Sequence, residues 1–260
     1  MISEARANSH KQNQLTIPNA DIPGMGINTR PSIPEQSPIF AVLLINPEVM
    51  VVPQTYTLPD SALLSVTSFP AIMTWQPDQV YVVLGRSNNA ESSVYTGRIE
   101  ADDAMLLKRP SGGEAVVLTP SMLVVACTDA IGRYRSPRDF FVLCNGVLID
   151  TFNQLGITGL SQRGISDISK EGMKIVGSSM YKGSDRLFYH AVINVAERSG
   201  TIAWYLKHPA REPDYRQGRH HDEFITSLHD LGFTGSIDDL AQTTQNRFMY
   251  RFEQPLNQDH

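Results

Sequence analysis

Two basic side chains and a pair of glycines stand together in the run KRPSGGEAV at residues 108–116. Arginine offers a planar fork of donors to a carboxylate or phosphate, and glycine lets a ligand come close to the backbone. The run lies between two short apolar stretches, so we expect a loop between two strands. This composition indicates a site for a small, anionic, partly apolar molecule. A plain hairpin with a solvated Lys-Arg pair is the structural alternative.

A lysine and a histidine further along the chain are the next candidates. Lys174 opens the run KIVGSS at residues 174–179, and His190 lies in an alternating apolar stretch at residues 187–195. A lysine can stabilise negative charge on a phosphate or a tetrahedral intermediate. The alternatives are an exposed strand-edge lysine and a histidine that only completes a structural hydrogen-bond network.

Taken in this order, the two runs resemble motifs of the lipoate–protein ligase A family, within the biotin/lipoate ligase and octanoyltransferase superfamily. Three more segments share the resemblance: VVLGRSNN at residues 82–89, SDI at 166–168 and PDYR at 213–216. It covers roughly residues 58–235. The resemblance implies an α+β fold with a mixed, largely antiparallel sheet flanked by helices, similar to a biotin/lipoate-ligase catalytic domain. Hairpins that alternate with helices agree with this class.

The resemblance also implies an activity. Such enzymes use ATP and Mg²⁺ to activate lipoate or octanoate as acyl-AMP, and then transfer the acyl group to a lysine of a lipoyl carrier domain. That carrier is a dehydrogenase E2 subunit or the glycine-cleavage H protein. Lys174 is the expected catalytic residue, and Asp167 is a candidate Mg²⁺ contact. The expected substrate-binding residues are Arg86, Asn88, Lys108, Arg109, Ser111, Gly112, Gly113, Ser178 and His190.

The sequence departs from the family pattern at several points. Glu114 stands where these ligases have a third glycine, Lys108 replaces an arginine, and Leu118-Thr119 replaces a His-Asp pair. Residues 236–260 are too few for the accessory domain of two-domain ligases. We therefore expect one catalytic domain at residues 38–260, after an extended or disordered arm at 1–37, with a separate accessory subunit as a candidate partner.

Two other functions remain open. One is an acyltransferase that moves octanoyl or lipoyl groups between carrier proteins with a cysteine nucleophile, placed before the lysine strand. The predicted loop at residues 159–171 has no cysteine, and Cys127 and Cys144 lie on apolar segments typical of core residues. The other is a homologue that binds a lipoyl group or a carrier domain without turnover, which Glu114 and the missing accessory domain would favour.

Composition limits the remaining classes. The 260 residues carry a net charge of -5, which argues against general binding to nucleic acid or to a membrane surface. No run approaches the ~20 apolar residues of a membrane span, and the polar N-terminus does not resemble a secretory signal. Two cysteines fit a reducing compartment, so we expect a cytoplasmic protein.

Local patterns predict the elements that position these residues. Asp60 is an expected N-cap, and Ser136 and Ser236 are expected to cap two further helices. The predicted helices cover residues 61–67, 90–103, 136–155, 201–206 and 222–231, and one begins at 236. The predicted strands cover residues 39–45, 71–75, 80–84, 105–108, 115–118, 122–127, 173–178 and 187–195.

Overall fold

The computed structural model describes residues 51–256, all of which belong to the second of the two units into which the chain divides, Pro47–His260. The predicted arm at residues 1–37 and the predicted strand at 39–45 lie outside the described residues. No helix in the described part is both long and apolar enough to cross a membrane.

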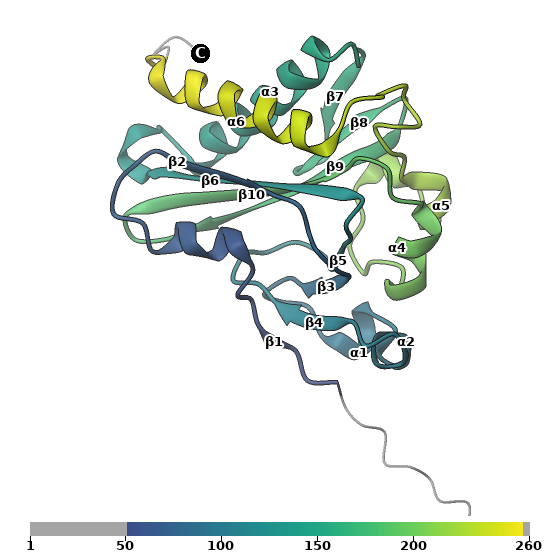
Figure 1. Ribbon diagram of the computed structural model, residues 1–260. Helices are drawn as coiled ribbons and strands as arrows, with labels where there is room; N and C mark the ends of the chain where they lie inside the picture. The colour runs from purple at the N-terminus through teal and green to yellow at the C-terminus, as the bar shows by residue number, and fades with distance from the viewer. Residues whose placement is uncertain (1–50, 257–260) are drawn as a thin grey trace, which may run out of the picture. The chain divides into compact units, whose positions relative to one another are not determined.

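A six-stranded antiparallel sheet forms the centre of the described part (Figure 1). Its long middle strands pair closely, with His190 directly opposite Ser179 in the register. This pairing places His190 beside the predicted KIVGSS run at residues 174–179. The strands, in spatial order, are β2 (Ala71–Trp75), β6 (Met122–Ala130), β10 (Arg186–Asn194), β9 (Met173–Lys182), β8 (Asp167–Lys170) and β7 (Leu160–Arg163).

A smaller four-stranded sheet carries the glycine loop (Figure 1). Two of its pairings are parallel and one is antiparallel, so the predicted α+β class with a mixed, largely antiparallel sheet is confirmed. In spatial order its strands are β1 (Gln54–Thr55), β4 (Met105–Lys108), β3 (Tyr81–Leu84) and β5 (Val116–Leu118). The loop at residues 109–115 connects β4 to β5.

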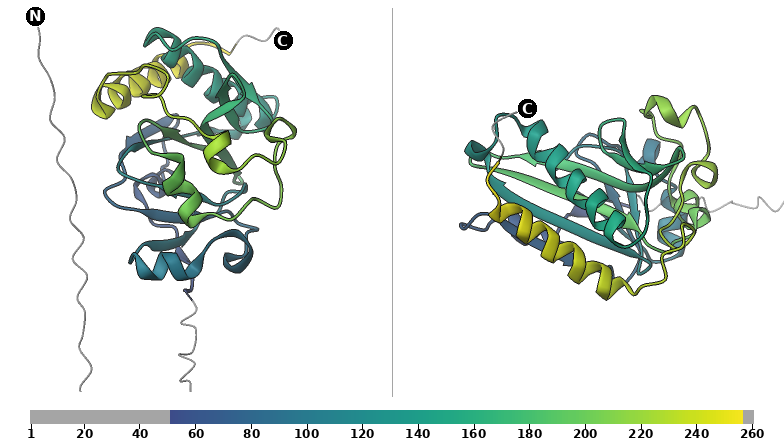
Figure 2. Two further views of the ribbon diagram at one scale, coloured as in Figure 1. Left: turned by 90° about the vertical axis from the view of Figure 1, so that its right-hand side faces the viewer. Right: turned by 90° about the horizontal axis from the view of Figure 1, so that it is seen from above.

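Two long helices, α3 (Pro137–Gln154) and α6 (Ile237–Glu253), lie across one face of the large sheet (Figure 2). Both begin where the sequence predicted. Ser136 caps α3 through a reciprocal bond with Asp139, and Ser236 caps α6. Phenylalanines from both helices, with Tyr189 of β10, fill the core between helices and sheet. This burial anchors β9 and β10, which supply the site.

Short helices occupy the other regions. The short α-helices are α1 (Ala90–Ser93), α2 (Thr96–Ala101), α4 (Ser199–Tyr205) and α5 (His221–Phe224). The 3-10 helices are η1 (Pro59–Leu64), η2 (Ile131–Arg133) and η3 (Asp214–Arg216). Figure 1 shows α4 and α5 together beside the ends of β9 and β5.

Strands β6 and β9 continue three and four residues past their predicted ends at 127 and 178, and four other predicted elements differ from the structure. The single helix expected at residues 90–103 is split into α1 and α2, because Val94 is extended and buried in a bridge with Leu206. The helix expected at 222–231 ends at Phe224, since Ile225 forms a bridge with Lys174. The loop expected at 159–171 contains the β7–β8 hairpin, whose polar sequence shows no apolar alternation.

The fourth difference concerns Asp60. It does not cap a helix over residues 61–67, because η1 begins at Pro59 after Leu58. The Asp60 side chain is instead wholly buried, where it accepts a hydrogen bond from the Tyr56 hydroxyl at 2.7 Å. A carboxylate in such a place requires further partners, and one of them is His190.

Candidate functional site

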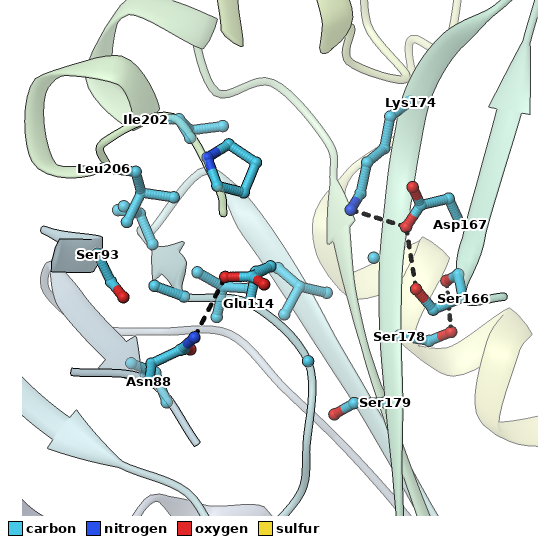
Figure 3. A pocket seen from close by; sticks show the side chains of 18 of the residues that line it. Asn88, Ser93, Glu114, Ser166, Asp167, Lys174, Ser178, Ser179, Ile202 and Leu206 are labelled. Carbon is cyan, nitrogen blue, oxygen red and sulfur yellow. Dashed lines mark hydrogen bonds and ion pairs between the residues drawn. The ribbon is translucent and has the colours of Figure 1, made fainter. Parts of the chain in front are cut away.

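A cavity of about 870 Å³ is lined by residues of both sheets, of α4 and α5, and of the segment before η3. Its size suits a small-molecule ligand. Figure 3 shows Lys174 and Asp167 on one side and Asn88 and Glu114 on the other. Part of the wall is apolar and is formed by Val116, Leu118, Met122, Val192, Ile202 and Leu206. The cavity therefore offers both a charged end and an apolar surface.

Arg109 holds the glycine loop in shape. Its guanidinium donates to the carbonyl oxygens of Gly112 and Glu114, both at 2.8 Å, and to that of Val83 at 3.2 Å. It also donates to the Ser111 hydroxyl at 3.1 Å. Burial lowers the pKa of Arg109 to about 10. The donor fork expected to receive a carboxylate thus binds the backbone of the loop itself.

The glycine loop and the loop after β3 are interlocked. The Arg86 amide donates to the Ser111 carbonyl, and the Asn88 side chain accepts from the Gly85 amide at 2.8 Å. Gly113 has a φ of 89°, a conformation that favours glycine. A Cβ atom on Gly85 would overlap the Gly113 carbonyl. Glycine is therefore required at both points where the two loops meet.

The predicted residues of these loops fall into two groups. Asn88, Arg109 and Gly113 line the cavity, whereas Arg86 and Gly112 are exposed and do not line it. Lys108 lies outside as well, with its ammonium on the Asn88 carbonyl at 3.2 Å. Glu114, the departure from the family pattern, does line the cavity and accepts a hydrogen bond from the Asn88 amide at 3.2 Å.

Lys174 and Asp167 form the charged end of the cavity. The Lys174 ammonium lies 2.8 Å from Asp167, and the lysine side chain is 28% exposed whereas the carboxylate is 6% exposed. β9 lies between β8 and β10, so Lys174 is not on an edge strand. A bulge at Ile168/Ser169 alters the β8–β9 register next to it. A bulge can re-aim a side chain, and the ammonium reaches the cavity from an interior strand.

Both carboxylate oxygens of Asp167 have partners. Oδ1 contacts Lys174, and Oδ2 accepts the Tyr215 hydroxyl at 2.9 Å. Burial, followed by the nearby Asp167 charge, raises the pKa of Tyr215, so the hydroxyl remains a donor. The carboxylate consequently orients Lys174 in this state. No group of three or more His, Cys, Asp or Glu side chains within residues 51–256 is arranged to hold a metal ion.

Arg216 lines the cavity, although the sequence indicated it only as part of the PDYR motif at residues 213–216. It is 4% exposed, and its guanidinium stacks on Phe224 at 4.8 Å. Nε donates to the Arg219 carbonyl, but Nη2 is buried and has no hydrogen-bond partner among the described residues. Burial lowers the pKa of Arg216. The guanidinium charge is paired, because Nε also lies 3.5 Å from the Glu212 carboxylate. A buried N–H without an acceptor is costly, so Nη2 is the unsatisfied group of this residue.

Ser178 and His190 have different environments. The Ser178 hydroxyl donates to the Ser166 carbonyl at 2.7 Å, and so serves to join β9 to the turn before β8. His190 contacts the hydroxyls of Ser179 and Ser111 at 2.6 and 2.8 Å and the Asp60 carboxylate at 3.2 Å. Burial lowers the pKa of His190, and Asp60 only partly opposes this effect.

Sequence reasoning missed Asp60 and Ser179 as members of the site. A signal for Ser179 was present, because it belongs to the predicted KIVGSS run, whose strand pairs with that of His190 and sets Ser179 opposite the histidine. Asp60 gave no such signal, since its partner His190 lies on a different element. The two cysteines are buried, 3.5 Å apart and outside the cavity lining, as expected of core residues.

Comparison with known proteins identifies the fold and the family. The chain matches the model of the lipoyl protein ligase A/B catalytic domain over residues 59–249. A lipoate-protein ligase A of Psychrobacter cryohalolentis is 28% identical over 141 residues, which are 54% of this chain and 40% of that relative. The alignment therefore spans less than half of the relative's length.

Solved structures share the arrangement of elements. A bi-partite lipoate protein ligase of Thermoplasma acidophilum has a TM-score of 0.64 at 18% identity, covering 74% of this chain and 75% of that one. A lipoate-protein ligase A bound with ATP has a TM-score of 0.61 at 18% identity, covering 71% and 73%. These likenesses show a common fold, as the sequence motifs predicted. Because the family model matches most of its length, the chain belongs to the lipoyl protein ligase A/B catalytic-domain family.

Proposed function

We propose that the chain is a lipoate–protein ligase that activates lipoate or octanoate as acyl-AMP and transfers the acyl group to a lysine of a lipoyl carrier domain. The observation that carries this proposal is the pair of cations at one end of a partly apolar cavity. Lys174 and Arg216 both line the cavity, each beside a carboxylate, Asp167 at 2.8 Å and Glu212 at 3.5 Å. Phosphate and carboxylate oxygens are the natural partners of such donors.

The apolar wall provides a place for the acyl chain. Leu118 and Met122 line the cavity from the β5–β6 side, and Ile202 and Leu206 line it from the α4 side. An acyl chain between these surfaces would direct its carboxylate toward the charged end. The Glu114 carboxylate is held by Asn88 on the facing wall, so it would repel an acyl carboxylate placed beside it. That repulsion favours placing the reacting carboxylate at Lys174.

Each residue at the charged end has a distinct part in the reaction. ATP, the co-substrate, supplies the leaving group: the acyl carboxylate displaces pyrophosphate from the α-phosphorus to give acyl-AMP. Lys174 neutralises charge on the α-phosphate and then on the tetrahedral intermediate formed when the carrier lysine attacks the acyl carbonyl. Asp167 and Tyr215 hold the Lys174 ammonium in position. Arg216 adds a second positive charge to the cavity lining, where it would attract the phosphate groups of the nucleotide.

The carboxylates of the cavity fit a limited role toward Mg²⁺. Asp167 already has partners on both oxygens, so a protein-held ion would have to displace Lys174 or Tyr215. Mg²⁺ is commonly bound by substrate phosphates and only one or two carboxylates. We therefore propose that Mg²⁺ enters with the nucleotide and lowers the charge on its phosphates, with Asp167 as at most one ligand.

Partners follow from the same proposal. The carrier is a lipoyl domain, of a dehydrogenase E2 subunit or of the glycine-cleavage H protein. The Thermoplasma neighbour is described as bi-partite, and this supports a separate accessory subunit as a second partner. A requirement for such a subunit would appear as carrier acylation that needs an added extract fraction or a coexpressed second chain.

The test uses the full chain, a lipoyl domain, Mg²⁺-ATP and either lipoate or octanoate. Mass spectrometry of the lipoyl domain should show one acyl group on its lysine. Lys174→Ala should reduce the rate by roughly 100-fold or more, because it removes a charge that stabilises the transition state. Lys182→Ala is the matched control: the lysine lies on the same strand, is exposed and does not line the cavity, and its loss should leave the rate unchanged.

Two results would contradict the proposal. Acylation that is undiminished in Lys174→Ala would remove the lysine from the mechanism. The absence of an acyl group under every condition, including with an accessory subunit, would favour a homologue that binds the lipoyl group or the carrier without turnover.

A further inference from the structure

Ser179, His190 and Asp60 form a hydrogen-bonded chain at the wall of the cavity. His190 Nε2 lies 2.6 Å from the Ser179 hydroxyl, and His190 Nδ1 lies 3.2 Å from Asp60 Oδ2. A hydroxyl, an imidazole and a buried carboxylate in this order are the parts of an activated serine. The adenylation mechanism proposed above uses none of the three.

The surroundings fix the direction of these hydrogen bonds. Asp60 is wholly buried, and its other oxygen accepts the Tyr56 hydroxyl, so the carboxylate acts as an acceptor toward Nδ1–H. Nε2 of the neutral ring is then an acceptor. Burial keeps the ring neutral, since it lowers the pKa of His190. The imidazole therefore presents an acceptor nitrogen to the hydroxyls of Ser179 at 2.6 Å and Ser111 at 2.8 Å.

Two serines lie near that base, but only one reaches the cavity. Ser111 is 1% exposed, does not line the cavity, and its hydroxyl accepts a bond from Arg109. Ser179 and His190 both line the cavity. Gly113 also borders this point, since a Cβ on it would stand 3.9 Å from the Ser179 Cβ. With no side chain on Gly113, an acyl carbonyl has access to the Ser179 hydroxyl.

We propose that Ser179 is a nucleophile that takes an acyl group directly from an activated donor of the ester or thioester class, without ATP. The Ser179 oxygen attacks the acyl carbonyl as its proton passes to His190 Nε2. The bond from the carbonyl carbon to the donor's oxygen or sulfur breaks, and the leaving group takes the proton from His190. The product is an acyl-Ser179 ester and a free alcohol or thiol.

Release follows the same path in reverse. His190 takes a proton from an incoming amine or water, which attacks the ester carbonyl. The bond between the carbonyl carbon and the Ser179 oxygen breaks, and the serine recovers a proton from His190. The products are an amide on the acceptor lysine or a free acid. This activity rests on the proposed function only for the acyl class of the substrate.

The probe is p-nitrophenyl octanoate, offered to the full chain without ATP or carrier. We expect rapid release of p-nitrophenolate and, after acid quench, an octanoyl group that peptide mass spectrometry places on Ser179. Ser179→Ala should abolish both. His190→Gln should slow acylation by roughly 100-fold or more, because it removes the general base. Ser184→Ala, in the exposed turn between β9 and β10, is the matched control and should react normally.

A second variant guards against loss of fold. Ser179→Cys keeps a nucleophile at the same point and should form an octanoyl thioester that hydroxylamine cleaves. Thermal unfolding of each variant shows whether it is folded. An adduct on Ser111 or on any other residue, or phenolate release that persists in Ser179→Ala, would overturn the proposal, as would no reaction in a folded wild-type protein.

The test also separates this inference from the ligase proposal. ATP-dependent acylation of the carrier, in a protein that never reacts with the ester, would overturn the Ser179 nucleophile and leave the ligase intact. An acyl-Ser179 adduct in a protein that makes no acyl-AMP would support the nucleophile and remove the ligase.

Discussion

Replacing Gly85 with alanine tests whether the glycine loop is locked by the loop that follows β3. A Cβ on Gly85 would overlap the Gly113 carbonyl oxygen and stand 3.0 Å from both the Gly113 carbonyl carbon and the Asn88 side-chain oxygen. Gly85 is not among the glycines with positive φ, so alanine can adopt its backbone conformation. The effect of Gly85→Ala is therefore a steric one.

These contacts determine how much stability and activity Gly85→Ala should lose. Real Cβ atoms essentially never approach a neighbour within 3.0 Å, and the obstacle is backbone, so the glycine loop must move by roughly 1 Å. Overpacking of this kind typically costs ~1–3 kcal/mol of stability. A displacement of about 1 Å at a site can reduce the rate by ~100-fold. We expect both losses together.

The assay combines urea unfolding with the rate of carrier acylation. Gly97→Ala is the matched control, because a Cβ there has no neighbour within 4 Å and the glycine lies in α2. It should raise stability by up to ~1 kcal/mol and leave the rate unchanged. A Gly85→Ala protein with normal stability and normal rate would show that the two loops are not locked, and would refute the role given to the Gly85–Gly113 contact.

Three further changes have definite expected outcomes. Burial, and then nearby positive charges, lower the pKa of His221 from 6.5 to about 4, and only Asp222 opposes this effect. Between these two pH values the unfolded state therefore binds one more proton than the folded state. Stability should fall as the pH drops from about 6.5 to about 4, by at most ~1.4 kcal/mol per pH unit. Urea unfolding of His221→Gln should show a shallower decline over that window, and an identical pH profile would contradict the assignment. Glu114→Gln removes a carboxylate from the cavity and should tighten octanoate binding by calorimetry, whereas weaker binding would show that Glu114 does not repel the ligand. Tyr215→Phe removes one neutral donor to Asp167 and should cost ~0.5–1.5 kcal/mol of stability, with a larger loss pointing to a wider network around Asp167.

The sequence predicted best the helices and strands whose formation depends on residues adjacent in the chain. Ser136 with Pro137 and Asp139 specifies the start of α3, and the alternation of apolar residues around Tyr189 specifies β10. These signals are local, so no knowledge of the fold is needed to find them. The glycine loop was predicted as a place where a ligand approaches the backbone, and that remains a prediction; the structure shows instead that Gly85 and Gly113 let two loops approach each other.

Residues whose roles depend on distant partners were predicted less well. Asp60 has the local features of a helix cap, but its burial and its bond to His190 arise only when η1 packs against the large sheet. Arg109 was expected to face a ligand; it lines the cavity, and its bonds to the carbonyls of Gly112 and Glu114 are the part that the sequence did not indicate. The β7–β8 hairpin was missed because its strands are paired through their backbones without an apolar pattern.

The central claim is that Lys174 acts on an acyl-adenylate, and pyrophosphate exchange tests it most directly. The full chain, supplied with octanoate, Mg²⁺, ATP and labelled pyrophosphate but no carrier, should return label to ATP only when octanoate is present. Lys174→Ala should lose this exchange, and Lys182→Ala should retain it. Exchange that is undiminished in Lys174→Ala, or carrier acylation that proceeds without any octanoate-dependent exchange, would contradict the account.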